Sequence, residues 1–191
     1  MVRIGITGGI GSGKSVVSSL LEVAGIPVYI ADTESKLLTN TSPMIRKQLT
    51  TLLGDELFAG GELNKQRLAS VIFNDPEMLK QVNGIIHPEV NRHFSDWVNR
   101  QTSKLCALES AILFESGFNR TVDVTVMVYA PLELRLTRVA ARDGASIESI
   151  RSRINNQLPD ETKMQKADYT IYNDDRQALI PQIQAFLNRL I

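Results

Sequence analysis

The chain has 191 residues, a length typical of one domain or of one domain that carries an insertion. Its residues are 43% hydrophobic and 22% charged, which excludes a disordered or fibrous chain. Lys and Arg together number 21, as do Asp and Glu, so the chain lacks the excess positive charge of dedicated nucleic-acid and anionic-membrane binders.

A single cysteine, Cys106, excludes an intrachain disulfide and a cysteine-rich metal site. No segment reaches the roughly 18 consecutive apolar residues of a membrane span, and no apolar core follows Arg3 as it would in a signal peptide. We therefore expect a soluble, cytoplasmic protein that binds neither nucleic acid nor membrane, with a monomer as the favoured state.

The first 30 residues predict a strand, a glycine-rich loop, a helix and a second strand. Residues 2–7 are a β-prone run that ends at glycines, and residues 14–24 carry apolar side chains at helical spacing before Gly25. Residues 26–30 form the second apolar run. This order is the βαβ pattern of a parallel sheet.

The next 73 residues, 32–104, contain helix-compatible segments and no convincing strand, which indicates a helical insertion that carries a second substrate. We expect its helices over residues 43–53, 65–73, 76–84 and 88–100. Strands and helices then alternate again, with strands over 105–108, 124–128 and 169–172 and helices over 132–142, 147–157 and from 176 or 177 to the end.

Residues 8–15, Gly-Gly-Ile-Gly-Ser-Gly-Lys-Ser, match the phosphate-binding P-loop pattern G-x-x-x-x-G-K-[ST] between the first strand and the first helix. Its glycines let backbone amides point at phosphate oxygens, and the helix N-terminus adds positive partial charge. Lys14 is then expected to reach the β- and γ-phosphates, and Ser15 to place its hydroxyl on Mg²⁺. The alternative is a glycine-rich turn that only joins a strand to a helix.

Two further features narrow the class of P-loop protein. A GTPase switch is disfavoured, because no glycine has Asp three residues before it and Asn64-Lys65 is not followed by the x-Asp of a guanine reader. Every basic residue between 105 and 162 is arginine, and Arg138 and Arg142 share a helix face at a spacing of four. Guanidinium groups pair well with phosphate oxygens and with the charge that develops on a phosphoryl group during transfer. We therefore expect these arginines to belong to a lid that closes over ATP. The alternative is a solvated helix with surface ion pairs.

These and other short motifs, in order along nearly the whole chain, resemble the dephospho-CoA kinase family. The motifs are the P-loop with its strand (4–15), Ala31-Asp32, residues 63–65 and 71–73, Asn83 to Val90 with His87-Pro88, Leu113 to Gly117 with Glu115, Arg138 to Asp143, Arg153 to Gln157, and Ala167 to Asn173. The chain departs from the family in having Ile30 where an acid is frequent, Ala111-Ile112 where Pro-Leu is usual, and Arg135 where Gln is common. The glycine often found after Asn173 is also missing.

The resemblance implies ATP- and Mg²⁺-dependent phosphorylation of the ribose 3′-hydroxyl of dephospho-CoA, the last step of coenzyme A synthesis. It implies an α/β fold: a three-layer P-loop kinase core with a parallel five-stranded sheet (1–31 and 105–191), a lid at about 138–166, and a helical CoA-binding insertion (32–104). The ATP-binding residues that it implies are Gly9, Gly11, Ser12, Gly13, Lys14, Ser15, Val16 and Asn173. The other classes that the sequence leaves open are a kinase of another small hydroxylated metabolite or nucleotide and a non-catalytic ATP-binding regulator.

Four residues are candidates for the acceptor and metal sites, and the first three also have a structural interpretation. Asp32, which follows the second strand, either receives or orients the proton of the acceptor hydroxyl or caps a helix starting at Thr33. Glu109 either holds Mg²⁺ through water or is an ordinary strand-end carboxylate. His87, placed before Pro88 at an expected helix start, and Glu115 are the other acceptor-site candidates.

Overall fold

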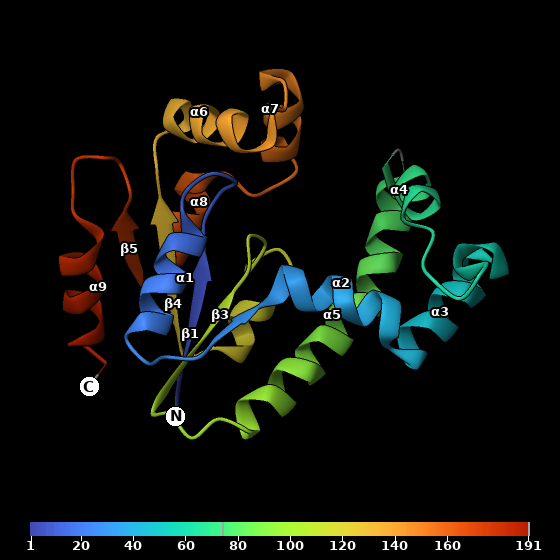
Figure 1. The fold of residues 1–191 in the computed structure, drawn as a ribbon, viewed down its shortest axis with the longest axis horizontal. Helices are drawn as coiled ribbons and strands as arrows, with labels where there is room; N and C mark the ends of the chain where they lie inside the picture. Colours follow the sequence, from blue (N-terminus) through green and yellow to red (C-terminus); the bar gives the residue numbers. More distant parts are fainter. Residues whose placement is uncertain (74, 191) are drawn as a thin grey trace. The chain divides into compact units, whose positions relative to one another are not determined.

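The computed structural model describes residues 1–73 and 75–190. The chain forms two compact units, Met1–Ile30 with Gln101–Ile191 and Ala31–Arg100. Figure 1 shows that the first is built around a sheet and the second from helices. Of the helices in the described ranges, none combines the length and hydrophobicity needed to cross a lipid bilayer.

Five parallel strands form the sheet of the first unit (Figure 1). They are β1 (Val2–Thr7), β2 (Val28–Ile30), β3 (Leu105–Glu109), β4 (Val124–Tyr129) and β5 (Tyr169–Tyr172), in the order β2-β3-β1-β4-β5. The predicted α/β class with a parallel five-stranded sheet is therefore confirmed. Because the chain leaves β1 towards β2 but leaves β4 towards β5, the carboxyl ends of β1 and β4 are where an open α/β sheet binds its ligand.

Side chains that alternate along the strands fill the space on both faces of the sheet. Ile4 and Ile6 lie on the face that packs against α1 (Lys14–Val23) and α9 (Leu179–Leu187). Gly5 lies on the other face, within close contact of Leu113. Burial on both faces explains why the strand sequences are continuously apolar rather than alternating with polar residues.

The remaining helices of this unit follow β3 and β4. They are the 3₁₀ helix η2 (Phe118–Thr121), α6 (Leu132–Asp143), α7 (Ile147–Asn155) and α8 (Asp160–Lys166). Leu136 and Val139 of α6 form a small separate core with Ile150 of α7. This core gives the expected lid region its own packing.

The second unit is entirely helical within the described residues. It contains α2 (Ala31–Thr41), α3 (Pro43–Leu53), the 3₁₀ helix η1 (Asp55–Phe58), α4 (Lys65–Phe73) and α5 (Pro76–Asn99). Helix α5 contributes four of its buried hydrophobic residues and α2, α3 and η1 contribute two each, whereas α4 has no buried residue.

The structure corrects several predicted elements. The predicted helices over 76–84 and 88–100 are one helix, α5, which ends at Asn99, so the expectation that His87-Pro88 starts a helix is wrong. Ile86 and Val90, buried on either side of Pro88, fix the helix across the proline. Helix α8 was not predicted, because its seven residues carry no apolar stripe.

Local hydrogen bonds explain two shorter elements. The strand β2 starts at Val28 rather than at residue 26, because the Ile26 amide donates to Leu21 O at the end of α1. The last helix starts at Leu179 rather than at 176 or 177. There the Asp174 carboxylate accepts from the Arg176 and Gln177 amides and holds a turn instead.

Candidate functional site

The P-loop, residues 8–15, curls between β1 and α1 as its sequence predicts. Its turn is closed by the Ser12 amide, which donates to Gly9 O over 3.1 Å. Gly13 is the N-cap of α1 and has a φ of 93°, in the left-handed region that favours glycine. A Cβ at Gly13 would also collide with the side-chain amide of Asn173. Both the backbone and the close neighbour therefore require glycine at this position.

The N-terminus of α1 is available for an anion. Among the described residues no side chain caps its first turn, so its amides keep their positive partial charge. The hydroxyls of Thr7 and Ser12 are buried, at 0% and 1% exposure, and have no hydrogen-bond partner in the described chain. Buried polar groups without partners are rare and indicate a missing ligand or water. This end of β1 and α1 is thus built to receive phosphate oxygens.

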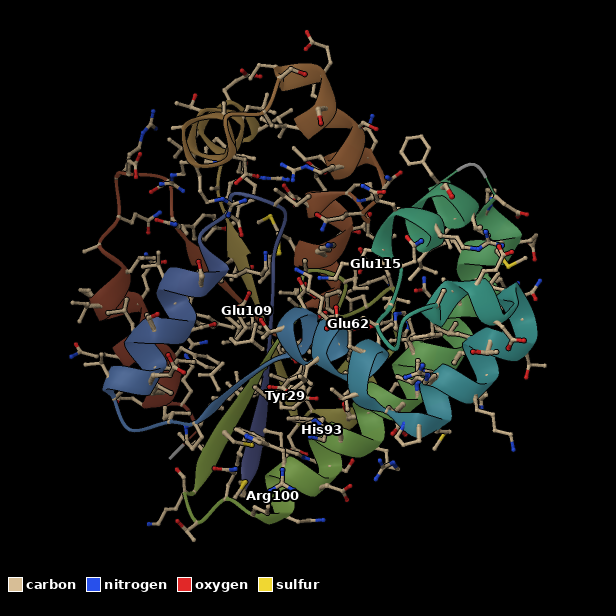
Figure 2. All side chains as sticks on the ribbon, turned by 45° about the vertical axis from the view of Figure 1, so that its right-hand side comes forward. Tyr29, Glu62, His93, Arg100, Glu109 and Glu115 are labelled. Carbon is tan, nitrogen blue, oxygen red and sulfur yellow. The ribbon has the colours of Figure 1, made fainter. Side chains whose placement is uncertain are left out.

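The oxygen donors beside the loop fit a magnesium ion that arrives with a nucleotide. Ser15 lies three residues before Ser18 on α1, and Ser18 donates to the Glu109 carboxylate over 2.8 Å. Glu109 is the last residue of β3 and is labelled in Figure 2. Across the described ranges there is no cluster of three His, Cys, Asp or Glu residues that could hold a metal. Mg²⁺ suits such a sparse set, because it is usually held by one or two carboxylates together with waters and phosphates.

Arg135 on α6 contacts the backbone of the P-loop through its guanidinium group, a role that the sequence did not reveal. Its side chain is 3% exposed, its Nε donates to Ile10 O over 2.8 Å, and its guanidinium forms an ion pair with Asp160 of α8. The same guanidinium lies so close to Gly9 that a Cβ there would collide with it. Burial raises the pKa of Asp160, and the charges of Arg135 and then Lys163 counteract that rise. Arg135 therefore ties α6 and α8 to the loop.

Two further contacts join the expected lid to the loop. Ile10, at the tip of the P-loop, packs against the small core of α6 and α7. The Gln157 side chain accepts a hydrogen bond from the Ile10 amide over 3.3 Å. The loop and the lid helices are thus in direct contact in this structure.

Arg138 and Arg142, the two predicted lid arginines, have different partners. Arg138 donates to the backbone oxygen of Asn173 over 3.1 Å and to Asp175 over 2.6 Å. Asn173 in turn donates its side-chain amide to Ser12 O over 2.8 Å, so the predicted nucleotide-binding residues Asn173 and Ser12 touch.

Arg142 shares the Asp143 carboxylate with Arg153 of α7, over 2.6 and 2.9 Å. The two guanidinium groups hold the pKa of Asp143 well below its usual range, Arg142 having the larger effect. Asp143 thereby places two arginines from different helices side by side.

Glu115, a predicted acceptor-site residue, is occupied by contacts with α8 and the loop before it. Its Oε1 accepts from the Leu158 amide over 2.8 Å and faces Lys163 Nζ at 3.0 Å. Lys163 is completely buried and donates to Ala111 O. These contacts give Glu115 a structural task whatever else it binds.

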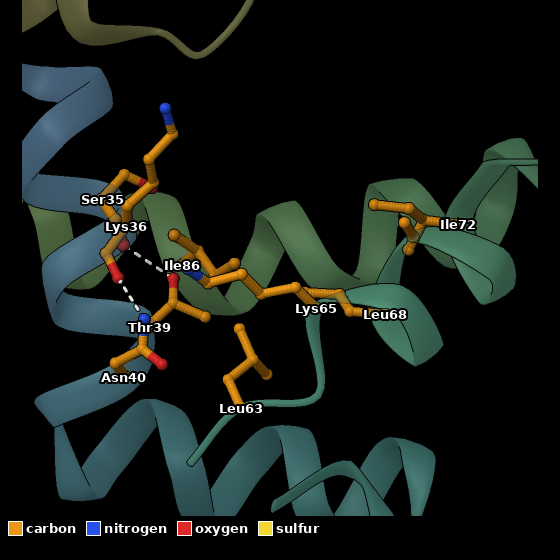
Figure 3. A pocket seen from close by; sticks show the side chains of 10 residues that line it. Ser35, Lys36, Thr39, Asn40, Leu63, Lys65, Leu68, Ile72 and Ile86 are labelled. Atoms are coloured by element: carbon orange, nitrogen blue, oxygen red, sulfur yellow. Dashed lines mark hydrogen bonds between the residues drawn. The ribbon is translucent and has the colours of Figure 1, made fainter.

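The predicted residues of the helical unit lie on α2 and α5. Asp32 is the second residue of α2 and is exposed, so it is not the N-cap of a helix starting at Thr33. His87 lies inside α5, where burial lowers its pKa. The same unit contains a pocket of about 390 Å³ between α2, α4 and α5 (Figure 3).

Comparisons with known proteins agree with this geometry. The dephospho-CoA kinase family model matches residues 2–178. A dephospho-CoA kinase of Bacteroides fragilis is 55% identical over 183 residues, covering 95% of this chain and 89% of that protein. The crystal structure of TT1252 from Thermus thermophilus has a TM-score of 0.84 at 35% identity and covers 99% of this chain and 95% of that one. Shikimate kinase from Aquifex aeolicus, 19% identical with a TM-score of 0.52 and coverage of 99% and 96%, shares the fold. The motif resemblance and the P-loop kinase fold are thus confirmed, and the chain belongs to the dephospho-CoA kinase family, the enzymes of the final step of coenzyme A biosynthesis.

Proposed function

We propose that this kinase binds ATP with Mg²⁺ at the P-loop and transfers the γ-phosphoryl group to the ribose 3′-hydroxyl of dephospho-CoA in the cytoplasm. One observation carries the donor side. The uncapped N-terminus of α1 lies beside the buried, unpartnered hydroxyls of Thr7 and Ser12, which is the arrangement that a polyphosphate would complete.

The nucleotide is held by the loop and by the residues that brace it. Amides of residues 9–16 surround the phosphates, and Lys14, which reaches back to Gly9 O over 3.4 Å, neutralises charge on the β- and γ-phosphates. Asn173 and Arg138 border the loop on the other side of Gly13 and are placed for the nucleoside. Arg142 supplies positive charge from the lid as the phosphoryl group moves.

Ser15 and Glu109 are the residues that would hold Mg²⁺, Ser15 directly and Glu109 through water. When bound, the ion neutralises the charge that builds up on the β- and γ-phosphate oxygens. The Ser18 hydrogen bond fixes one carboxylate oxygen of Glu109 against α1, three residues along the helix from Ser15.

On the acceptor side we assign Asp32, His87 and Glu115, with the helical region 32–104 as the CoA-binding part. Asp32 follows β2 directly in the chain, and Ile30, the last residue of β2, pairs with Glu109 in the sheet register. An exposed carboxylate there can orient the ribose hydroxyl and receive its proton. Because phosphoryl-transfer transition states are loose, most of its effect is positioning.

The test is formation of coenzyme A from dephospho-CoA, ATP and Mg²⁺ by the purified chain, followed by chromatography. Lys14→Met should abolish turnover without unfolding the chain. Activity on another small alcohol in the absence of coenzyme A formation would refute the proposed acceptor.

A paired variant tests Asp32 separately. Asp32→Asn should lower kcat by more than tenfold at saturating ATP, whereas Glu34→Gln, the other acid in the first turn of α2, should leave it nearly unchanged. If kcat of Asp32→Asn stays within about threefold, a difference of less than 1 kcal/mol, Asp32 has no catalytic role.

A further inference from the structure

The buried side chain of Arg135 bonds the P-loop at one peptide, the one that joins Ile10 to Gly11. Arg135 Nε donates to Ile10 O over 2.8 Å, and the Arg135 side chain is 3% exposed. This peptide is trans and planar, so the carbonyl of Ile10 and the N–H of Gly11 point in opposite directions. A donor that fixes the Ile10 carbonyl therefore also fixes the direction of the Gly11 N–H, away from Arg135.

The Gly11 amide is suited to a ligand, because the amides on either side of it are engaged within the chain. The Ile10 N–H donates to the Gln157 side chain over 3.3 Å, and the Ser12 N–H donates to Gly9 O over 3.1 Å. Within residues 1–73 and 75–190 the Gly11 N–H has no hydrogen-bond partner. Backbone amides of a loop that curls in this way form anion-binding concavities. The Gly11 N–H is thus left for a phosphate oxygen.

Lys14 indicates which phosphate lies beside Gly11. The Lys14 Nζ reaches back to Gly9 O over 3.4 Å, so its ammonium group lies against the half of the loop that contains Gly9 and Gly11. A P-loop lysine neutralises the β- and γ-phosphates. The Gly11 N–H is therefore at the γ-phosphate end of a bound triphosphate.

Two helices hold Arg135 in place. Helix α6 packs its backbone directly on the loop, because a Cβ on Gly11 would collide with Arg135 O and with the Val139 side chain. The Arg135 Nη1 forms the ion pair with Asp160, the first residue of α8. The donor to Ile10 O and the ion pair thus use different nitrogen atoms of one guanidinium group, and each can be removed without the other.

We propose that Arg135 is a positioning residue for phosphoryl transfer, which aims the Gly11 N–H at the γ-phosphate end of ATP by holding Ile10 O. The inference rests on the proposed function, because it takes ATP as the ligand of the P-loop. In the transfer the bond between the γ-phosphorus and the β–γ bridging oxygen breaks, a bond from the ribose 3′-oxygen forms, and the hydroxyl proton passes to Asp32. Negative charge then grows on the oxygen that stays with ADP, and an amide fixed in advance stabilises it.

Two substitutions of Arg135 in the full chain separate the hydrogen bond from the ion pair. In glutamine Nε2 is bonded to Cδ, as Nε is in arginine, so Arg135→Gln keeps a donor for Ile10 O but loses the pair with Asp160. In Arg135→Met a methyl group takes the place of that nitrogen, and both contacts are lost. Both variants should melt at a lower temperature than the parent, because both leave the Asp160 carboxylate without its partner.

Activity should distinguish the two variants although their stability does not. At saturating ATP and dephospho-CoA, Arg135→Met should lower kcat about tenfold or more, whereas Arg135→Gln should keep kcat within about threefold of the parent. KM for dephospho-CoA should change less than about twofold in both. Arg3→Met, which breaks an exposed ion pair with Asp123 at the start of β1, is the matched control and should leave kcat unchanged.

A double variant keeps the test decisive if Arg135→Met folds poorly. Arg135→Met with Asp160→Leu removes the carboxylate that would be left unpaired, so it should regain stability, but it still lacks a donor for Ile10 O. Its kcat should therefore stay about tenfold below that of the parent, with circular dichroism at the assay temperature establishing that it is folded. Recovery of both the melting temperature and kcat would show that Arg135 acts only by holding the fold, and would overturn the proposal.

Calorimetry with ATP and with ADP, each with Mg²⁺ and without dephospho-CoA, gives a readout that needs no turnover. Arg135→Met should weaken ATP binding about tenfold and ADP binding less than about threefold, because the misplaced amide faces the γ-phosphate end. Arg135→Gln should bind both nucleotides within about threefold of the parent.

The outcomes separate this inference from the proposed function. If the unmodified chain makes coenzyme A while Arg135→Met and Arg135→Gln have the same kcat, the assignment of Arg135 is wrong and the function stands. If the chain forms no coenzyme A, the function fails, and Arg135→Met that binds ATP as tightly as Arg135→Gln overturns the assignment independently. A chain that binds no ATP overturns both.

Discussion

Replacing Arg135 by methionine should lower the melting temperature by about 6–12 °C. The variant keeps most of the side-chain volume but removes the guanidinium that pairs with Asp160 and donates to Ile10 O. Removing one partner of a buried ion pair costs about 3–5 kcal/mol. With Arg135 at 3% and Asp160 at 14% exposure, we take the lower end of about 3 kcal/mol, and each kcal/mol corresponds to about 2–4 °C in a chain of this size.

The loss should depend on pH in a direction set by Asp160. Burial raises the folded-state pKa of this carboxyl above its unfolded value, and Arg135 counteracts the rise. Without Arg135 the folded-state pKa of Asp160 rises further, so the ionised carboxylate destabilises the fold at neutral pH. This destabilisation disappears as pH falls through that pKa and the carboxyl is protonated. The gap in melting temperature between Arg135→Met and the parent should therefore narrow from pH 7 to pH 5.

Differential scanning calorimetry at both pH values measures this effect. The double variant Arg135→Met with Asp160→Leu should recover at least half of the loss, because replacing both members of a buried pair by apolar groups is often neutral. A melting temperature within 2 °C of the parent, or a double variant no more stable than the single one, would refute the reasoning.

Two further substitutions test the P-loop and the lid. Gly13→Ala should weaken ATP binding more than tenfold, because the new Cβ collides with Asn173. Gly25→Ala is the control, since Gly25 also has a positive φ but an added Cβ there would have no atom within 4 Å. It should lower the free energy of unfolding by only about 1 kcal/mol and leave ATP binding intact. Equal effects on ATP affinity, measured by calorimetry, would contradict this. Asp143→Asn should lower kcat several-fold without changing the melting temperature, since it loosens the exposed pair of Arg142 and Arg153; an unchanged kcat would show that this pairing has no part in transfer.

The sequence predicted the elements whose determinants are local. The βαβ start follows from an apolar run, a glycine loop and a helical period, and the helices Pro43–Leu53 and Lys65–Phe73 have the predicted bounds. Helix α5 is different, because whether a helix continues through Pro88 depends on the packing of its neighbours in the folded unit. Only tertiary contacts decide that.

The candidate site divides in the same way. The P-loop could be identified because its residues are contiguous and their types are constrained by phosphate. Arg135 and Asp160 could not be, since the pair is separated by 25 residues and acts on Ile10, 125 residues away from Arg135. Lys163 gave no signal either, because nothing local distinguishes a buried lysine from a solvated one. The Pro159-Asp160-Glu161 helix start was the cue that could have located α8.

The position of Cys106 matters for an enzyme whose acceptor and product both carry a sulfhydryl. Its thiol lies within β3 at 0% exposure, and burial raises its pKa, so almost none of it is the thiolate that attacks disulfides. Oxidised coenzyme A therefore finds no reactive sulfur on the folded protein. The kinase can thus work among thiols and disulfides without forming a mixed disulfide with its own product.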